Sequence, residues 1–190
     1  MTMTAPTYGP VVIGIDPSLT ATGIAGSNGW CDVVGWTKKP PITGLPHPER
    51  REALHEIRQL ITDTIGRPDL AVMELPAHSR SGGGAHERGW LWWEIYNYLA
   101  ALEVPTGFMS TGQRAMYATG KGNATKGAVI DAVARRWPRY TTNGDDNAAD
   151  AITLMAAGRD WLGYPLTDMP KTHRKAIDNA VWPHLLGAAA

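Results

Sequence analysis

Cysteine is nearly absent from this chain, since Cys31 is the single one among 190 residues. A lone cysteine excludes an internal disulfide, and no histidine or aspartate stands around Cys31 at the spacing of a catalytic triad or a metal site. We therefore interpret Cys31 as a small core residue. No apolar run approaches the roughly 20 residues that cross a bilayer. The first ten residues, MTMTAPTYGP, have neither the basic nor the apolar stretch of a secretory signal, so we expect a cytoplasmic protein with no membrane contact.

Net charge is also absent, because 18 basic side chains balance 18 acidic ones. This balance argues against a protein that holds nucleic acid by its total charge. The distribution is uneven, however: residues 110–140 carry six basic side chains and one acid, Asp131, whereas acids gather at 145–150. A basic face beside an acidic pocket can bind a polyanion, although charge alone is explained equally well by a solvated helix face.

Hydrophobic periodicity predicts an α/β protein with one domain. Three strands come first and form an antiparallel meander, and further strands then alternate with amphipathic helices. The predicted strands are 11–16, 21–26, 32–36, 70–74 and 106–109, and the predicted helices are 49–65, 87–102, a short one after Ser110, 125–137, 146–162 and a weaker basic one at 171–181. This order favours a mixed sheet flanked by helices over a doubly wound repeat. We assign 1–10 to an N-terminal extension, 11–162 to the domain and 163–190 to a tail.

Aromatic residues recur along the predicted helix 87–102, at Trp90, Trp93 and Tyr96. Aromatic side chains at helical spacing are typical of a core or of a dimer interface, and less often of a platform for nucleobases. The pattern alone does not choose between core and interface.

Acidic residues stand at the ends of two buried strands. The stretch VVIGIDPSLTATGIA (11–25) runs into Asp16 and then into proline and small residues, and LAVMELPAH repeats the pattern at Glu74. Asp150 lies within an apolar helix, where an unpaired charge is costly. A turn, a strand end or a helix dipole explains each acid singly. One divalent cation would neutralise all three.

The candidate ligands are all oxygen atoms, with no histidine or cysteine at zinc spacing. Oxygen ligands favour Mg²⁺ or Mn²⁺, with Ca²⁺ a weaker choice. Two such ions, about 3.5–4 Å apart, can activate water and stabilise the leaving oxygen in phosphodiester cleavage. The sequence therefore predicts a magnesium site, and the small residues after Asp16 would let a backbone come close to it.

Four segments together resemble the RuvC family of Holliday junction resolvases, within the ribonuclease H-like superfamily. They are GIDPSLTATGIA, VMELPA, TGKGNATKGAV and DDNAADAI, in the family's order. The resemblance implies a ribonuclease H-like fold over 11–162. It also implies a homodimer that binds four-way DNA junctions and nicks two opposed strands with Mg²⁺ or Mn²⁺, two ions in each active site. The composition and the DDNAAD variant are more similar to phage-encoded members, whose location would be the host cytoplasm.

The resemblance assigns catalytic and metal-binding roles to Asp16, Glu74 and Asp150. Asp146 is our choice for a fourth catalytic metal ligand, with Asn147 as a local hydrogen-bonding residue, although helical spacing allows either as the ligand. Phosphate binding is carried over to three basic residues: Lys126, Lys121 and Arg114. A lysine and glycines at a helix start suit a phosphate backbone.

The sequence departs from the family at Ala77, where an aromatic residue often stands as a wedge at the junction centre. Three alternatives exist, of which chain length disfavours the last. A nuclease of the same fold could act on flaps, forks or structured RNA, and a non-catalytic module could only bind junctions. An actin-like or sugar-kinase ATPase begins similarly but needs two such domains, for which this chain is too short.

Overall fold

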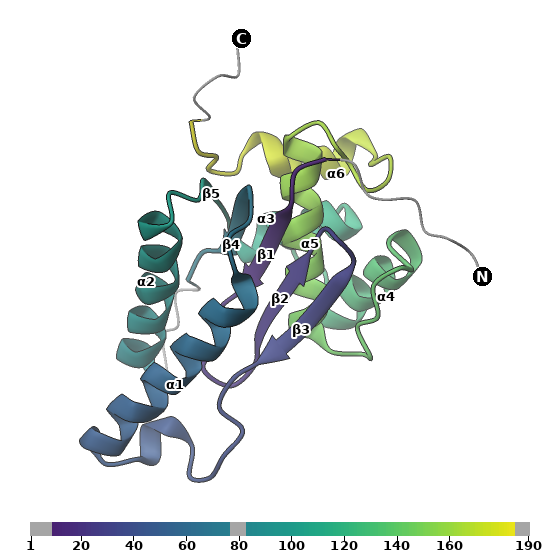
Figure 1. The fold of residues 1–190 in the computed structure, drawn as a ribbon. Helices are drawn as coiled ribbons and strands as arrows, with labels where there is room; N and C mark the ends of the chain where they lie inside the picture. The colour runs from purple at the N-terminus through teal and green to yellow at the C-terminus, as the bar shows by residue number, and fades with distance from the viewer. Residues whose placement is uncertain (1–8, 77–82, 185–190) are drawn as a thin grey trace, which may run out of the picture.

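Five strands form one mixed sheet at the centre of the structure, a computed structural model that describes residues 9–76 and 83–184 (Figure 1). Their order across the sheet is β3-β2-β1-β4-β5. The first three strands are antiparallel, and β4 and β5 continue the sheet parallel to β1. The strands are β1 (Val12–Asp16), β2 (Thr22–Gly26), β3 (Trp30–Val34), β4 (Leu70–Glu74) and β5 (Thr106–Met109). This architecture confirms the predicted α/β class, with a meander and further strands.

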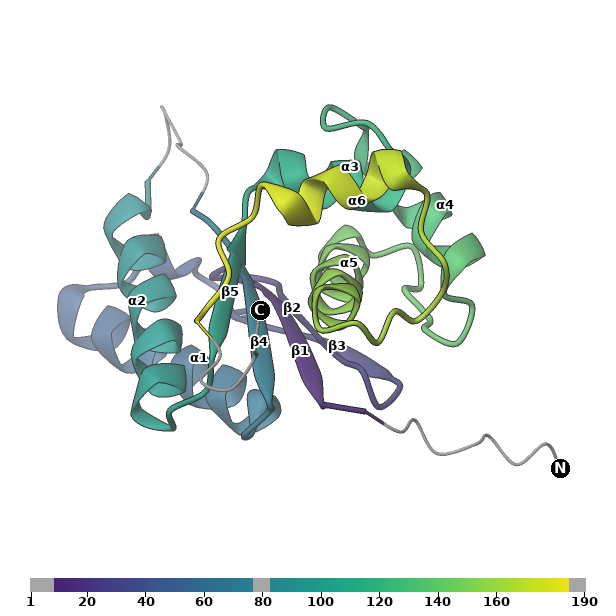
Figure 2. The same cartoon turned by 90° about the horizontal axis from the view of Figure 1, so that it is seen from above.

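Helices cover both faces of the sheet (Figure 2). Helices α1 (His47–Ile65) and α2 (Ala85–Ala101) lie on one face, and a short 3₁₀ turn, η1 (Ile42–Gly44), precedes them. On the other face α5 (Asp146–Trp161) packs directly on the strands. Helices α3 (Thr111–Thr119) and α4 (Lys126–Arg136) pack against α5, and α6 (Lys171–Asp178) packs against α3. None of the described helices is both long and apolar enough to cross a membrane.

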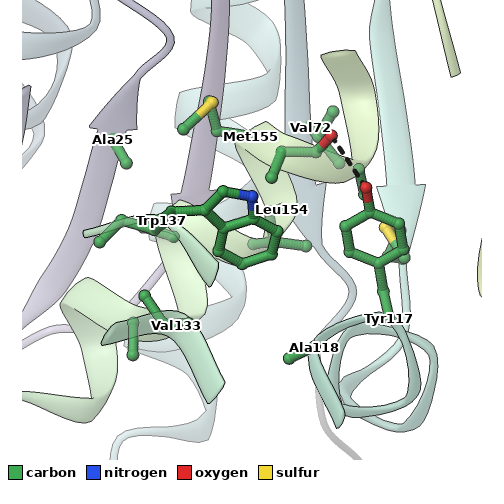
Figure 3. Close-up of a cluster of buried hydrophobic side chains, with 14 of the residues drawn as sticks. Ala25, Val72, Tyr117, Ala118, Val133, Trp137, Leu154 and Met155 are labelled. Atoms are coloured by element: carbon green, nitrogen blue, oxygen red, sulfur yellow. Dashed lines mark hydrogen bonds between the residues drawn. The ribbon is translucent and has the colours of Figure 1, made fainter. Parts of the chain in front are cut away.

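Two hydrophobic cores follow from the alternation of side chains along the strands. In β1, Ile13 and Ile15 pack beneath α1 and α2, whereas Val12 faces α5. On the α5 side the rings of Tyr117 and Trp137 stack with their centroids 6.2 Å apart (Figure 3). The Tyr117 hydroxyl donates a hydrogen bond to the buried carbonyl of Ala156. These contacts fix α3 and the end of α4 against α5.

The helix predicted at 171–181 is too long, because α6 ends at Asp178. Beyond it the chain turns to the edge of the sheet, where Val181 and Phe108 exchange backbone hydrogen bonds of 2.7 and 3.0 Å. Trp182 then stacks on Trp161, with ring centroids 4.7 Å apart. The backbone of Phe108, on β5, thus provides the hydrogen-bond partners of Val181, which helical periodicity had placed in α6.

Two other expectations shift in the structure. The third strand covers Trp30–Val34 rather than 32–36, because a tight turn after β2 pairs Gly26 with Trp30. In α2 the buried stripe consists of Leu91, Trp92, Ile95 and Leu99. Trp93 is 58% exposed and lies outside that stripe.

Candidate active site

Asp16 and Glu74 end two neighbouring parallel strands side by side. The register pairs Ile15 of β1 with Met73 of β4, so the two acids occupy the next position on each strand. Because side chains alternate between faces, both acids point to the α5 face, opposite to Ile15 and Met73. The acid–proline pattern of the sequence therefore describes a shared sheet edge.

Close packing of α5 on the sheet brings Asp150 to the same edge. A Cβ added to Gly14 would collide with the carbonyl of Ala151, and one added to Gly23 would collide with the carbonyl of Asn147. Glycine at these positions lets the helix backbone lie directly on β1 and β2. The helix then presents the buried carboxylate of Asp150 toward Glu74.

Arg114, on α3, joins two of these acids. Its Nε donates to Glu74 Oε2, and its Nη1 forms an ion pair with Asp150 Oδ1. All three residues are more than 90% buried. The other oxygen of Glu74, Oε1, accepts a 2.7 Å hydrogen bond from the hydroxyl of Thr111, which sequence reasoning missed. The suggested role of Arg114 in phosphate binding stays a prediction, and in this structure its guanidinium is buried against Glu74 and Asp150.

Asp146 lies at the start of α5 and pairs with Lys126, at the start of α4. Asp145, not Asp146, caps the helix: its Oδ1 accepts from the backbone N–H groups of Asn147 and Ala148 at 2.8 and 3.1 Å. The Asn147 side chain also donates to Asp145, at 3.2 Å. Asn147 is therefore engaged locally, and the Asp146 carboxylate is free of capping.

The fold disfavours the ionised form of Asp16. Burial, followed by the negative charge of Glu74, raises the pKa of Asp16 to about 7, with Asp146 adding to the effect. Arg114 and Lys126 oppose the rise but do not cancel it. The hydrogen bond from Lys126 has the reverse effect on Asp146 and lowers the pKa of that carboxyl. A further positive charge beside Asp16 would stabilise its ionised form and lower its pKa.

The carboxylates have the chemistry of a divalent-metal site, since they offer oxygen atoms only and carry more negative charge than Arg114 and Lys126 neutralise. Within residues 9–76 and 83–184, no three carboxylate, histidine or cysteine side chains stand close enough together to hold an ion. Two protein cations lie among the acids instead. The donor set fits Mg²⁺, provided that these cations yield their oxygens to it.

A hollow of about 670 Å³ with three basic lining residues and one acid, Asp131, lies between the loop at 120–125 and α4. Lys121, Arg135 and Arg136 are among its lining residues. Lys126 follows the lining residue Thr125 and is 78% exposed along its side chain. Lys121 and Lys126 are thus exposed, whereas Arg114 is buried. Ala77, the site of the missing wedge, lies outside the described residues.

No protein-family model and no curated protein matches this sequence. The fold, however, is a known α/β architecture, a mixed sheet in the order β3-β2-β1-β4-β5 with helices on both faces. It is the fold of RuvC. The structure of Thermus thermophilus RuvC in complex with a Holliday junction substrate superposes with a TM-score of 0.60 and 21% identity, over 82% of this chain and 98% of that one. A second Thermus thermophilus RuvC structure gives a TM-score of 0.56 at 21% identity, over 81% and 97% of the two chains.

Proposed function

We propose that this protein is a metal-dependent endonuclease that resolves four-way DNA junctions. The observation that carries the proposal is the placement of Asp16 and Glu74 at adjacent strand ends, with Asp150 joined to Glu74 through Arg114 and with Asp146 near enough to raise the pKa of Asp16. This group stands in a fold shared with RuvC, which was solved with a Holliday junction substrate. Acids placed in this way are difficult to explain by stability, because burial and then the negative charge of Glu74 raise the pKa of Asp16.

In this proposal Asp16, Glu74, Asp146 and Asp150 hold two Mg²⁺ ions, and Mn²⁺ can replace them. When bound, the ions would lower the pKa of a water and stabilise the oxygen that leaves phosphorus. The chain's own part is to fix the carboxylates: strand ends hold Asp16 and Glu74, and α5 holds Asp150. Thr111 orients the Glu74 carboxylate through its hydrogen bond to Oε1.

The DNA backbone would follow the basic hollow toward the acids. Lys121 and Lys126 supply charge to phosphate oxygens, and the exposed pair of Lys126 with Asp146 exchanges easily because water screens it. Such contacts position a duplex arm and carry no sequence information. The net charge of +0 does not oppose this role, because the basic residues cluster on one surface.

Paired nicking requires two active sites, so the proposal includes a homodimer. The feature that favours it is the exposed indole of Trp93 on α2, next to half-buried Trp90 and Tyr96. Large aromatic side chains of this kind are enriched in protein interfaces. Analytical ultracentrifugation of the wild type and of Trp93→Ala tests this point, with a monomeric variant as the expected result.

The decisive experiment compares substrates of identical sequence but different shape. Labelled four-way junction, fork, flap, linear duplex and structured RNA are incubated with the protein in Mg²⁺, Mn²⁺ or EDTA. We expect paired nicks in the junction with either metal and none in EDTA. Asp16→Asn should abolish nicking and retain junction binding, whereas the matched control Asp63→Asn, on the exposed side of α1, should cut normally.

Each other outcome has a distinct meaning. Cleavage of flaps, forks or RNA in preference to junctions would assign the protein to another nuclease class of this fold. Tight junction binding with no cleavage under any metal would indicate a binding module. Full activity in EDTA would refute the metal site itself.

A further inference from the structure

Arg114 is held firmly at its position by the helix that carries it. Helix α3 begins with a capping box, in which the Ser110 side chain accepts from the Gln113 backbone N–H and the Gln113 side chain accepts a 2.7 Å hydrogen bond from the Ser110 backbone N–H. One turn beyond Arg114, Tyr117 anchors the helix to α5 through Ala156 and Asp160. The guanidinium therefore reaches the acids from a rigid support.

The contacts of Arg114 are those that a metal ion would need. Its two nitrogens engage Glu74 Oε2 and Asp150 Oδ1, on β4 and α5. A divalent ion bound to the same oxygens would place its charge against a guanidinium, and at close range in a buried site this repulsion is severe. The arginine and the ion cannot share these two oxygens.

We propose that Arg114 is an internal counterion that holds the metal-free site together and withdraws from Glu74 and Asp150 when metal binds. The inference rests on the proposed metal-dependent function and adds a regulator of metal affinity to it. In the metal-free protein Arg114 prevents two buried carboxylates from facing each other unpaired, which is a costly arrangement. Metal must compete with it, so the apparent affinity is lower than the carboxylates alone would give.

Lys126 is a useful contrast, because it is also paired with an acid of the site. Its side chain is 78% exposed and contacts Asp146 alone, whereas the Arg114 side chain is 8% exposed and bridges two acids. A solvated single contact is weak and screened by salt. Competition with metal is therefore a property of Arg114 and not of every cation near the site.

The test measures Mn²⁺ binding to the full chain without DNA, by electron paramagnetic resonance of the free ion. The variants are Arg114→Gln, Arg114→Lys and the matched control Arg51→Gln, an exposed arginine on α1 that pairs with its neighbour Glu52. We expect the dissociation constant to fall about tenfold or more in Arg114→Gln, since a competing buried charge is gone. The dissociation constant of Arg114→Lys should lie between those of Arg114→Gln and the wild type, and that of Arg51→Gln should equal the wild-type value.

An equal or weaker affinity in Arg114→Gln overturns the inference and leaves the proposed function intact, provided that the wild type binds Mn²⁺. Absence of Mn²⁺ binding in every variant overturns both. A variant that fails to fold is replaced by a measurement on the wild type, in which nuclear magnetic resonance follows the arginine Nε–H signals during Mg²⁺ titration. The Arg114 signal, identified by its loss in Arg114→Lys or by its contact with Glu74, should move; a stationary signal refutes the withdrawal.

Discussion

Replacement of Asp16 by asparagine is expected to stabilise the metal-free protein, and to do so more strongly as pH rises. The pKa of Asp16 is about 7 in the fold, against an ordinary value of 3.8, because burial and the charges of Glu74 and Asp146 disfavour its ionised form. Between these values the unfolded chain has released the proton and the folded chain retains it, so stability falls as pH rises from about 4 to 7. A difference of about three pKa units corresponds to a loss of about 4 kcal/mol in the free energy of unfolding, and this loss is complete by pH 8.

Asparagine has the same shape and no charge, so Asp16→Asn recovers this loss. For a chain of this length about 4 kcal/mol corresponds to a rise in melting temperature of roughly 10 °C at pH 8, with a smaller rise at pH 5. Thermal unfolding in EDTA, followed by circular dichroism at both pH values, measures the effect. Asp63→Asn, on an exposed face, should change stability by less than about 0.5 kcal/mol.

The reasoning is refuted if Asp16→Asn melts at or below the wild type at pH 8, or if its advantage does not grow with pH. Addition of Mg²⁺ provides an internal check. An ion that relieves Asp16 should raise the melting temperature of the wild type at pH 8 and have a smaller effect on the variant. An equal rise in melting temperature in the two proteins would indicate that Asp16 does not belong to the metal site.

Three further results are expected. Lys126→Ala should weaken junction binding and reduce the slope of log affinity against log salt by about one, as filter binding at several salt concentrations can measure. Asp146→Asn should slow cleavage in Mg²⁺ by orders of magnitude with little loss of thermal stability. Asn147→Ala should keep its cleavage rate and lose about 1 kcal/mol of stability, because its hydrogen bond to Asp145 is removed. An inactive Asn147→Ala beside an active Asp146→Asn would reverse the two roles. Gly23→Ala should destabilise by about 3 kcal/mol in chemical denaturation, because its methyl group meets the Asn147 carbonyl, and a neutral result would contradict the close packing of α5.

The sheet was predictable because its strands carry strong local signals. Strands 70–74 and 106–109 match β4 and β5 residue for residue, since each is a short apolar run between turn residues. The end of α6 was not predictable in the same way. Its limit depends on the backbone pairing of Val181 with Phe108, a contact between residues more than 70 positions apart.

The residues of the candidate site also differ in how far the sequence could predict them. Asp16 and Glu74 could be found from sequence, because an acid that ends a buried strand is unusual, and Asp150 because it interrupts an apolar helix. The burial of Arg114 was missed, because an arginine among basic residues is typical of a surface. A signal was present nonetheless: Arg114 lies three and four residues before Tyr117 and Ala118, on the buried face of α3. Its partners come from β4 and α5, so only the assembled fold identifies them.

The pairing of Val181 with the edge of β5 has a practical consequence for the handling of this protein. The segment after α6 donates to and accepts from Phe108, and Trp182 covers Gly107. Exposed strand edges recruit other chains and promote aggregation. A truncation designed from the apparent domain limit near residue 162 would uncover this edge together with the Trp161 ring. Expression of a shortened chain should therefore retain residues through 184, and a solubility tag is better attached beyond that point than in place of the segment.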